Sequence, residues 1–217
     1  MMHPDTEFKL VNETIGYGVF ATAFIPAGTI VYIRDAMEVV IPAQDTMLTD
    51  PRYRDVIDKY SYIDGEGNHI ISWDHAKYVN HCCQCNTMST GWGFEIAVRD
   101  IQAGEEITDE YGIFNMSHEM ELKCCKDGCR GKLTPQDFEL YGDQWDQTIQ
   151  SAMKKMNGLA QPLMAYMDPK KQKDLDVYLK TGKGYRSIKL EKYDPAASGR
   201  IGEKNILRQQ VTAEAEV

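Results

Sequence analysis

Short β-prone segments separated by glycine and proline turns make up the first 110 residues, and this pattern constrains the fold more than any other feature. Residues 19–21, 29–33 and 38–41 are rich in β-branched and aromatic side chains, which favour strands. Residues 92–98 and 106–111 continue the pattern on either side of an Ala-Gly turn. We therefore expect a compact, mainly β domain with some α-helix.

Two stretches depart from the β pattern. Residues 50–51, Asp-Pro, favour a helix start, and apolar residues recur at helical spacing over 53–60. Helix formers dominate from the Thr-Pro-Gln-Asp sequence at 134–137 onward. The expected organisation is a β-rich domain at 8–133 followed by a helical, basic C-terminal extension at 134–217.

Composition excludes several classes of protein. Hydrophobic residues are 42% and charged residues 26% of the 217, which is typical of a globular chain rather than a disordered one. No stretch approaches the roughly 20 apolar residues that a membrane span needs, and the start lacks the layout of a secretory signal. We expect an intracellular protein without membrane association, whose six cysteines are reduced, reactive or metal-bound.

Charge is distributed unevenly along the chain. The formal net charge of −9 argues against general nucleic-acid binding. Residues 1–150 hold 11 Lys and Arg against 25 Asp and Glu, net −14, whereas residues 151–217 hold 13 against 8, net +5. Either the acidic surface only keeps the protein in solution, or the acidic body attracts a basic substrate.

Four short motifs occur along the chain: GYGVFA at 16–21, NHCCQCN at 80–86, GEEITDEYG at 104–112 and CCKDGCRG at 124–131. Each motif alone is a common turn, dipeptide or strand entry. In this order and at these separations, they resemble the SET-domain family of protein-lysine methyltransferases. The resemblance covers about residues 8–133 and implies a SET-domain β-fold in which the second and third motifs pass through one another as a pseudoknot.

The resemblance implies S-adenosylmethionine as the methyl donor. The family's Gly-x-Gly turn contacts this cofactor through backbone groups, which correspond here to Ile15, Gly16 and Tyr17. Glycine suits such a position because the backbone can approach a ligand where no Cβ intervenes. The family's Asn-His pair corresponds to Asn80 and His81, which are expected to hold the methionine amino group and the adenine.

Tyr111 closes the third motif, and the resemblance places it beside both the target amine and the methyl group of the cofactor. The upstream tyrosine that lines the lysine channel matches Tyr60, with Tyr62 as the alternative. Methyl transfer is an in-line displacement that needs a deprotonated lysine, and an apolar aromatic channel favours loss of the proton. A phenol with an ordinary pKa of about 10 is a poor base at pH 7, so we expect Tyr111 to orient the amine.

Asp109 departs from the family pattern, in which Phe or Tyr at this position helps to set the number of methyl groups added. Because residues two apart on a strand share a face, we expect Asp109 to face the same channel as Tyr111, at its mouth. A local bulge would instead remove Asp109 from the channel. A carboxylate beside the target nitrogen favours the ammonium form and opposes transfer unless it is hydrogen-bonded or solvated.

The cysteines predict one structural zinc ion, because the family's post-SET segment, Cys-x-Cys-x4-Cys, joins the cysteine of the Asn-His motif around zinc. The first position of that triple is Leu122 here, so a fourth thiolate must come from elsewhere to complete a tetrahedral site. The predicted ligands are Cys83, Cys85, Cys124 and Cys129, with Cys125 as the alternative to Cys85. The competing interpretation is a set of buried thiols that pack as small hydrophobic groups.

These observations predict a protein-lysine N-methyltransferase that acts on a basic protein or peptide such as a histone tail. The alternative is a catalytically inert, zinc-stapled SET-like module for protein interaction, but a scaffold has no reason to keep both Asn80 and Tyr111. A thiol redox protein is a weaker third hypothesis, since no Cys-x-x-Cys precedes a helix. Only 15 residues precede the first glycine motif, so we expect no cysteine-rich pre-SET region and no lysine-9-type histone H3 enzyme.

Overall fold

The computed structural model describes residues 1–122 and 127–195, and within them short strands form four small sheets. The strands are β1 (Thr6–Asn12), β2 (Gly16–Ala21), β3 (Ile30–Ile33), β4 (Val39–Ile41), β5 (Ser61–Ile63), β6 (His69–Ile71), β7 (Asn80–His81), β8 (Thr87–Ser89), β9 (Phe94–Ala97), β10 (Glu106–Asp109), β11 (Met120–Glu121) and β12 (Lys132–Leu133).

Helices are fewer and concentrate after residue 136. The α-helices are α1 (Arg54–Tyr60), α2 (Asp137–Met153) and α3 (Pro169–Thr181). Short 3-10 helices are η1 (Thr46–Thr49), η2 (His75–Tyr78), η3 (Tyr111–Ile113), η4 (Met164–Tyr166) and η5 (Ile188–Glu191). None of the helices in the described part of the chain has the length and apolar character needed to span a bilayer. The predicted class, mainly β with some α-helix, is confirmed.

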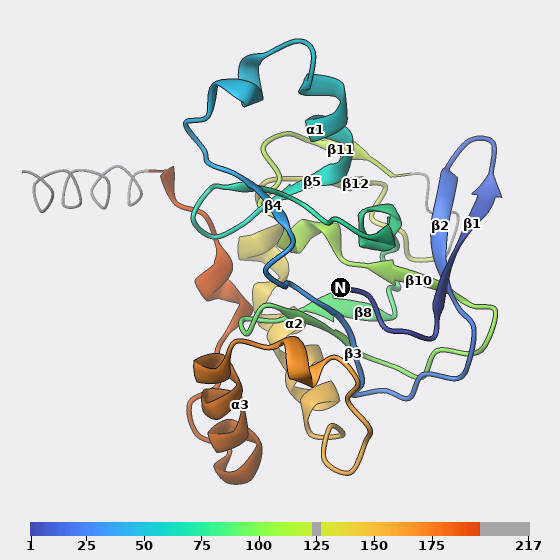
Figure 1. The fold of residues 1–217 in the computed structure, drawn as a ribbon, viewed down its shortest axis with the longest axis vertical. Coiled ribbons are helices and arrows are strands. Elements are labelled where there is room, and N and C mark those ends of the chain that lie inside the picture. Colours follow the sequence, from blue (N-terminus) through green and yellow to red (C-terminus); the bar gives the residue numbers. More distant parts are fainter. Residues whose placement is uncertain (123–126, 196–217) are drawn as a thin grey trace, which may run out of the picture.

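The sheet that positions the site has the strand order β1-β2-β10-β7. Strands β1 and β2 form the hairpin at one side of the molecule (Figure 1). Strand β10 pairs antiparallel with β2, where Ile107 lies opposite Val19, and parallel with β7, where Thr108 lies opposite Asn80. The first three sequence motifs therefore meet in one sheet, although long stretches of chain separate them.

Hydrogen bonds beyond the strand ladder hold the segment after β7 against β10. The side chain of Asn86, which is 0% exposed, accepts from the Thr108 N–H at 2.8 Å and donates to the Glu106 carbonyl at 2.8 Å. The Cys82 N–H donates to the Asp109 carbonyl at 3.2 Å. The second and third motifs are thus interlocked, as the expected pseudoknot requires.

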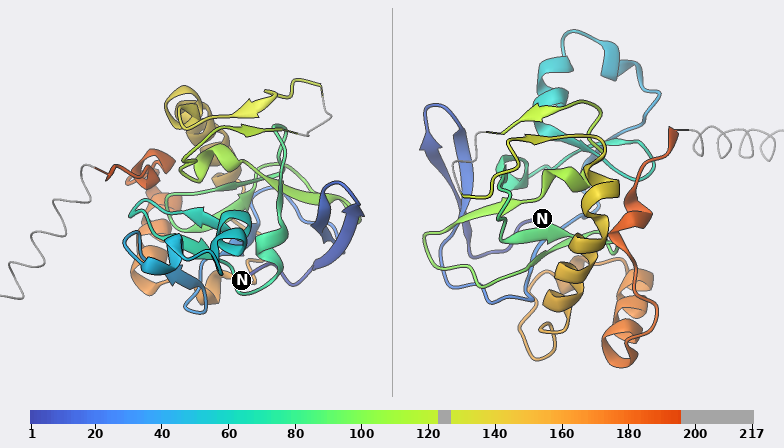
Figure 2. Two further views of the ribbon diagram at one scale, coloured as in Figure 1. Left: turned by 90° about the horizontal axis from the view of Figure 1, so that it is seen from above. Right: turned by 180° about the vertical axis from the view of Figure 1, so that it is seen from behind.

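The C-terminal helices pack into the same core as the strands. Helix α2 begins at Asp137, as the sequence predicted, and runs behind the sheets beside α3 (Figure 2). The buried face of α2 consists in part of Phe138, Trp145, Ile149 and Met153. These side chains share one hydrophobic core with residues on and beside the β3-β9-β8 sheet, among them Ile30, Ile33, Trp92 and Phe94. Gln161 fastens the following loop, donating to the Gly28 carbonyl and accepting from the Ile30 N–H, both at 2.8 Å.

The sheet β4-β6-β5 and helix α1 form the opposite wall of the site. Strands β5 and β6 pair antiparallel as a hairpin around residues 65–68. Helix α1 begins at Arg54, after a turn at the predicted Asp50-Pro51 start. It ends at Tyr60, and the chain enters β5 at Ser61. The two candidate tyrosines, Tyr60 and Tyr62, therefore lie on different elements.

We expect Asn86→Ala to lower the free energy of unfolding by about 2–3 kcal/mol, because it leaves the Thr108 N–H and the Glu106 carbonyl buried without partners. Urea unfolding measures this change. The matched control is Asn157→Ala at an exposed position, which should shift stability by no more than about 0.5 kcal/mol. Equal effects of the two variants would contradict the role given to Asn86.

Candidate active site

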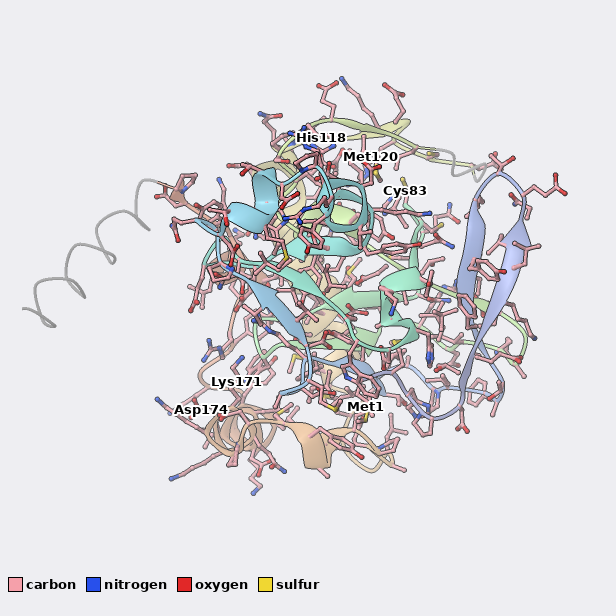
Figure 3. The ribbon with its side chains drawn as sticks, turned by 45° about the horizontal axis from the view of Figure 1, so that its top comes forward. Met1, Cys83, His118, Met120, Lys171 and Asp174 are labelled. Atoms are coloured by element: carbon pink, nitrogen blue, oxygen red, sulfur yellow. The ribbon has the colours of Figure 1, made fainter. Side chains whose placement is uncertain are left out.

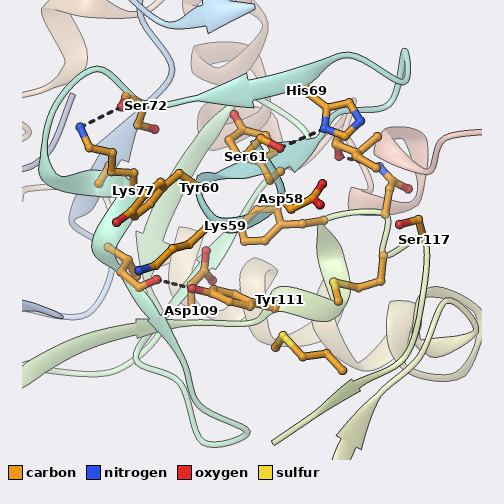
Figure 4. A pocket seen from close by; sticks show the side chains of 18 of the residues that line it. Asp58, Lys59, Tyr60, Ser61, His69, Ser72, Lys77, Asp109, Tyr111 and Ser117 are labelled. Carbon is orange, nitrogen blue, oxygen red and sulfur yellow. Dashed lines mark hydrogen bonds between the residues drawn. The ribbon is translucent and has the colours of Figure 1, made fainter. Parts of the chain in front are cut away.

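A cavity of about 240 Å³ lies between α1, β5 and the segment that follows β10 (Figure 4). Five aromatic side chains form part of its walls: Tyr32, Tyr60, Tyr62, Tyr111 and Phe114. Charged side chains also line it: the carboxyl groups of Asp58, Glu95 and Asp109, and the amines of Lys59 and Lys77. The structure therefore brings the predicted Tyr111 into one cavity with both upstream tyrosine candidates.

Tyr111 begins η3 directly after the turn that ends β10. Its hydroxyl donates to the Val79 carbonyl at 2.5 Å, and its ring contacts His81 at 5.5 Å and Phe114 at 5.9 Å between ring centroids. Loss of water around the hydroxyl, and then the nearby Asp109 carboxylate, raise the pKa of Tyr111 well above its ordinary value. Tyr111 is therefore a neutral phenol near pH 7, which suits orientation rather than proton abstraction.

Tyr60 and Tyr62 face the cavity from different walls. The ring of Tyr60 packs edge-on against Tyr78, with centroids 5.5 Å apart. The ring of Tyr62 packs against Phe114 at 5.0 Å, and Phe114 in turn contacts Tyr111. Tyr62 is thus joined to Tyr111 through one aromatic ring, whereas Tyr60 belongs to the wall that η2 completes.

Asp109 ends β10 and is only 1% exposed. Glu110 then caps η3, so Asp109 and Tyr111 are not two apart on one strand as the sequence predicted. Both nevertheless line the cavity, because the turn at Glu110 directs them to the same space (Figure 4). No bulge removes Asp109 from the cavity, so the alternative named from the sequence does not hold, but the side chain is buried rather than exposed at a mouth as expected.

Glu95 is a site residue that the sequence reasoning missed. It lies on β9 opposite Tyr32, and its carboxyl group is within hydrogen-bonding reach of the Asp109 carboxyl group. Burial raises the pKa of Glu95 to about 7, and burial together with the Glu95 charge raises the pKa of Asp109. A charged residue inside the otherwise apolar strand Phe94–Ala97 could have indicated from the sequence that Glu95 is a site residue.

Asn80 links β7 to the glycine turn between β1 and β2. Its side-chain Nδ2 donates to the Tyr17 carbonyl at 3.1 Å and to Glu106 Oε1 at 2.8 Å. Gly18 leaves no room for a side chain, because an added Cβ would lie 2.6 Å from Glu106 Oε1 and 3.0 Å from Asn80 Nδ2. Three predicted elements, the turn, Asn80 and the third motif, are therefore in direct contact.

The main chain of the glycine turn is open to a ligand. Gly16 has a φ of +87°, and no atom lies within 4 Å of the position that its Cβ would occupy. Its neighbours Ile15 and Tyr17 are 45% and 48% exposed. Within the described part of the chain, the side-chain NH₂ group of Asn80 donates to the Tyr17 carbonyl and to Glu106. Its amide oxygen therefore remains as the acceptor for an ammonium group. This donor set fits the backbone-held cofactor that the sequence predicted.

His81 braces the turn before Tyr111. Its Nδ1 lies 3.1 Å from the Asp109 carbonyl and 3.3 Å from the Tyr111 amide nitrogen, and its Nε2 lies 3.5 Å from Cys83 Sγ. Burial and the positive charge of Arg130 lower the pKa of His81 to about 4, so the ring is neutral near pH 7. The structure thus gives the His81 side chain a positioning role.

Cys83 and Cys129 approach each other with their sulfurs 3.9 Å apart. In a tetrahedral site with Zn–S bonds of about 2.3 Å, neighbouring sulfurs lie about 3.8 Å apart, so this pair has the spacing of two zinc ligands. The N–H groups of Arg130 and Gly131 each donate to one of these sulfurs at 3.4 Å. Figure 3 shows Cys83 on the same side of the molecule as His118 and Met120.

Cys85, the third predicted zinc ligand within the described residues, does not group with this pair. Cys85 is buried, and burial raises the pKa of its thiol. Over residues 1–122 and 127–195, no three His, Cys, Asp or Glu side chains are grouped to hold a metal ion, so Cys85 does not form a three-ligand group with Cys83 and Cys129. Cys124 and Cys125 lie outside the described residues.

Arg130, from the fourth motif, connects the cysteine pair to the active-site turn. Its guanidinium group donates to Glu110 Oε1 at 2.5 Å, pairs with Asp137 Oδ2 at 3.2 Å and stacks over the Tyr141 ring at 4.8 Å. Glu110 Oε1 also accepts from the Gly112 N–H at 2.9 Å and so caps η3. The fourth motif, the turn before Tyr111 and helix α2 are therefore tied together by one charged network.

Comparison with known proteins matches part of the chain to one family. Residues 16–112 match the family model of the SET domain. The chain is 30% identical over 143 residues to the variant-silencing SET domain-containing protein of Plasmodium falciparum (isolate 3D7), an alignment that covers 58% of this chain and 5% of that protein. The chain thus spans only about one twentieth of the length of this relative.

A solved structure of a proposed histone methyltransferase from Plasmodium falciparum aligns with 51% of this chain and with 95% of its own chain. The two sequences are 19% identical, and the TM-score of 0.38 is too low to support a conclusion.

The raised pKa of Glu95 predicts how stability depends on pH. Between about pH 4.5 and pH 7 the folded protein retains a proton that the unfolded chain has released, so the free energy of unfolding decreases as pH rises through this window. Glu95→Gln cannot ionise, so it avoids this decrease in the free energy of unfolding. We expect the variant to be about 1–3 kcal/mol more stable than the wild type at pH 8.

Urea unfolding at intervals from pH 5 to pH 8 measures the difference between the two proteins. Asp176→Asn on the exposed side of α3 is the matched control and should follow the wild-type curve. Parallel curves for wild type and Glu95→Gln would contradict the buried environment assigned to Glu95.

Proposed function

Residues 16–112 match the SET-domain family model, and we propose that the chain is an S-adenosylmethionine-dependent protein-lysine N-methyltransferase of that family. The observation that carries this proposal is the position of Tyr111 in an aromatic cavity, on a turn that follows the strand joined to both Asn80 and the glycine turn. An inert interaction module is the alternative, and such a module needs neither the cavity nor an open glycine turn beside Asn80.

The residues around the glycine turn would hold the cofactor. The main chain of Ile15, Gly16 and Tyr17 is open, the Asn80 amide oxygen is placed to accept from an amino group, and His81 supplies backbone next to β10. When bound, S-adenosylmethionine supplies an electrophilic methyl group on a positively charged sulfur. Glu106, hydrogen-bonded to Asn80, adds negative charge that favours such a cation.

The cavity suits the side chain of a lysine. Aromatic rings from β5 and from the segment after β10 would pack along the alkyl stem and exclude water. An amine in such surroundings loses its proton more readily than in water, because desolvation disfavours the charged form. Tyr111, a neutral phenol whose hydroxyl donates to the Val79 carbonyl, would hold the nitrogen in line with the methyl group.

A basic protein segment, of which a histone tail is one example, is the proposed substrate class. Residues 1–150 carry a net charge of −14, and a surface of that sign attracts Lys-rich and Arg-rich segments. Each further substrate residue with positive charge would speed association, most strongly at low ionic strength.

A structural zinc ion is the second component of the proposal. The spacing of Cys83 and Cys129 fits two of its four ligands. Cys124 and Cys125 would supply the others, which replaces Cys85 in the predicted set by the alternative named from the sequence. Zinc bound there would hold the fourth motif in place. Arg130, which donates to both Cys83 and Glu110, would then help to hold the turn before Tyr111.

The first test of the proposed enzyme uses Tyr111→Phe and Asn80→Ala. Loss of the orienting hydroxyl should lower the turnover number at least about tenfold, or about 1.4 kcal/mol of barrier, with little change in cofactor binding. Asn80→Ala should mainly weaken cofactor binding, measured by calorimetry. Transfer of labelled methyl from S-adenosylmethionine to a Lys-rich peptide gives the rates, and Tyr166→Phe at an exposed position is the control.

Wild-type rates in both site variants would contradict the roles given to Tyr111 and Asn80, and no methyl transfer by the wild type would favour the inert module.

The second test concerns the metal. Untagged protein should contain about one zinc ion per chain by elemental analysis, and Cys129→Ser should lose it, because structural zinc needs four ligands. Cys85→Ser is the matched control and should retain zinc, since Cys85 does not join the Cys83–Cys129 pair. Less than about a tenth of an equivalent in the wild type would contradict the zinc proposal.

A further inference from the structure

Two carboxyl groups meet inside an aromatic cavity, and nothing in the mechanism above uses them. Asp109 comes from the end of β10 and Glu95 from β9, and their carboxyl groups are within hydrogen-bonding reach of each other. Figure 4 shows Asp109 next to Tyr111, on the side of the cavity that faces Tyr60. Carboxyl groups this close to aromatic rings are costly to bury unless a ligand or a proton compensates their charge.

One oxygen of Asp109 is free to bind a ligand. Its Oδ1 accepts from the Glu110 N–H at 2.7 Å. Its Oδ2 is buried and, among the described residues, accepts from no amide, hydroxyl, amine or guanidinium group. Asp109 as a whole is only 1% exposed, and it lines the cavity. A buried acceptor that faces a cavity is satisfied when a donor from a bound molecule enters.

The surroundings of this carboxyl pair, Glu95 with Asp109, are anionic. The titratable and charged groups that act on it from neighbouring elements include Glu38, Asp74, Glu110, Cys85, Tyr62, Tyr111 and the α-amino group of Met1. The Met1 amino group lies 3.3 Å from Asp35 and 3.7 Å from Glu38, so its charge is shared with those carboxylates. Arg34 is paired with Asp64 at 3.0 Å. Two cations, Lys59 and Lys77, also line the cavity; Lys77 Nζ donates to the Asp74 carbonyl at 3.0 Å, and Lys59 Nζ lies 5.2 Å from the centre of the Tyr60 ring. The carboxyl groups around the pair favour a cation at the pair itself.

We propose that Glu95 and Asp109 bind the ammonium group of the target lysine and take up the proton that it must lose before methyl transfer. This inference rests on the proposed function and names two further residues of the same site.

The step balances as follows. An N–H bond of the ammonium breaks, and the proton forms an O–H bond on the carboxyl pair. The electron pair left on the nitrogen then forms the new N–C bond with the methyl group, the C–S bond breaks, and its electrons remain on the sulfur, which becomes a neutral thioether. The proton on the pair returns to solvent after the product leaves.

A pair of carboxylates suits this task better than one. Two neighbouring carboxylates repel each other, and sharing one proton relieves that repulsion, so the pair accepts a proton more readily than an isolated carboxylate. This removes the objection that a lone carboxylate would only stabilise the ammonium. It also explains how a site with a neutral Tyr111 moves the proton away from the nitrogen.

The same geometry selects for nitrogen atoms that carry N–H groups. An unmodified ammonium has three N–H donors for the pair, and each added methyl group removes one and adds bulk. Carboxylate acceptors therefore favour lysine with few methyl groups. We expect low degrees of methylation in the product.

The first experiment measures binding without the reaction. Titration of the wild type with n-butylammonium at pH 8, followed by NMR, should show tighter binding than titration with n-butyltrimethylammonium. Glu95→Gln and Asp109→Asn keep the shape of the cavity and remove the charge. In both variants the ratio of the two dissociation constants should therefore fall at least about threefold. Asp176→Asn on α3 should keep it. Equal binding of the two probes to the wild type would overturn the proposed ammonium site.

The second experiment is the pH profile of methyl transfer to a Lys-rich peptide. Glu95→Gln and Asp109→Asn should be at least about tenfold slower than the wild type near pH 7.5 and should approach it near pH 10, where free lysine is half deprotonated. A merely structural defect would lower the rate by the same factor at every pH.

The outcomes separate this inference from the proposed function. Methyl transfer by the wild type with unchanged pH profiles in both variants would overturn the role of the carboxyl pair and leave the enzyme assignment standing. Loss of the probe preference in the variants, with no methyl transfer by the wild type to any lysine peptide, would keep the ammonium site and overturn both the proton transfer and the enzyme assignment.

Discussion

The pairing of β10 with two strands from distant parts of the chain is the interaction on which the site depends. Strand β10 is antiparallel to β2 and parallel to β7, so the glycine turn and Asn80 lie on opposite sides of it. Its last residue is Asp109, and the turn that follows delivers Tyr111 to the cavity. Removal of either neighbour of β10 would leave these side chains without a fixed position.

Burial and charge then determine what this position can do. The walls around Tyr111 are aromatic, which keeps its hydroxyl neutral and disfavours charge on a bound amine. Glu95 and Asp109 compensate by giving a cation a place to bind. Outside the cavity, Arg130 pairs with Glu110 and Asp137, whereas Asp109 faces the cavity without an ion pair to any of the described residues.

The sequence predicted those parts of the structure that local patterns determine. The strands around residues 19–21, 30–33 and 106–109 and the start of α2 follow from side-chain composition and turn residues. The convergence of Asn80 and the glycine turn needed the family resemblance, because no local pattern reports a parallel pairing between residues 80 and 108.

Other features depend on contacts through space, which the sequence does not display. In the sequence, Glu95 is one charged residue in a strand, and only the fold shows that β9 and β10 place it near Asp109. The strand period predicted a shared face for Asp109 and Tyr111; they do share the cavity, but through a turn at Glu110. Tyr60 and Tyr62 could not be separated by spacing, since both reach the same cavity from different elements.

The most direct measurement of the central claim is the chemical fate of the methyl group. The protein is incubated with S-adenosylmethionine carrying a deuterated methyl group and a basic peptide with a single lysine, and the peptide is sequenced by mass spectrometry. The account predicts the deuterated methyl on the lysine side-chain nitrogen and none on the same peptide with arginine in place of that lysine. No label at saturating cofactor, or label on any other residue, would contradict it.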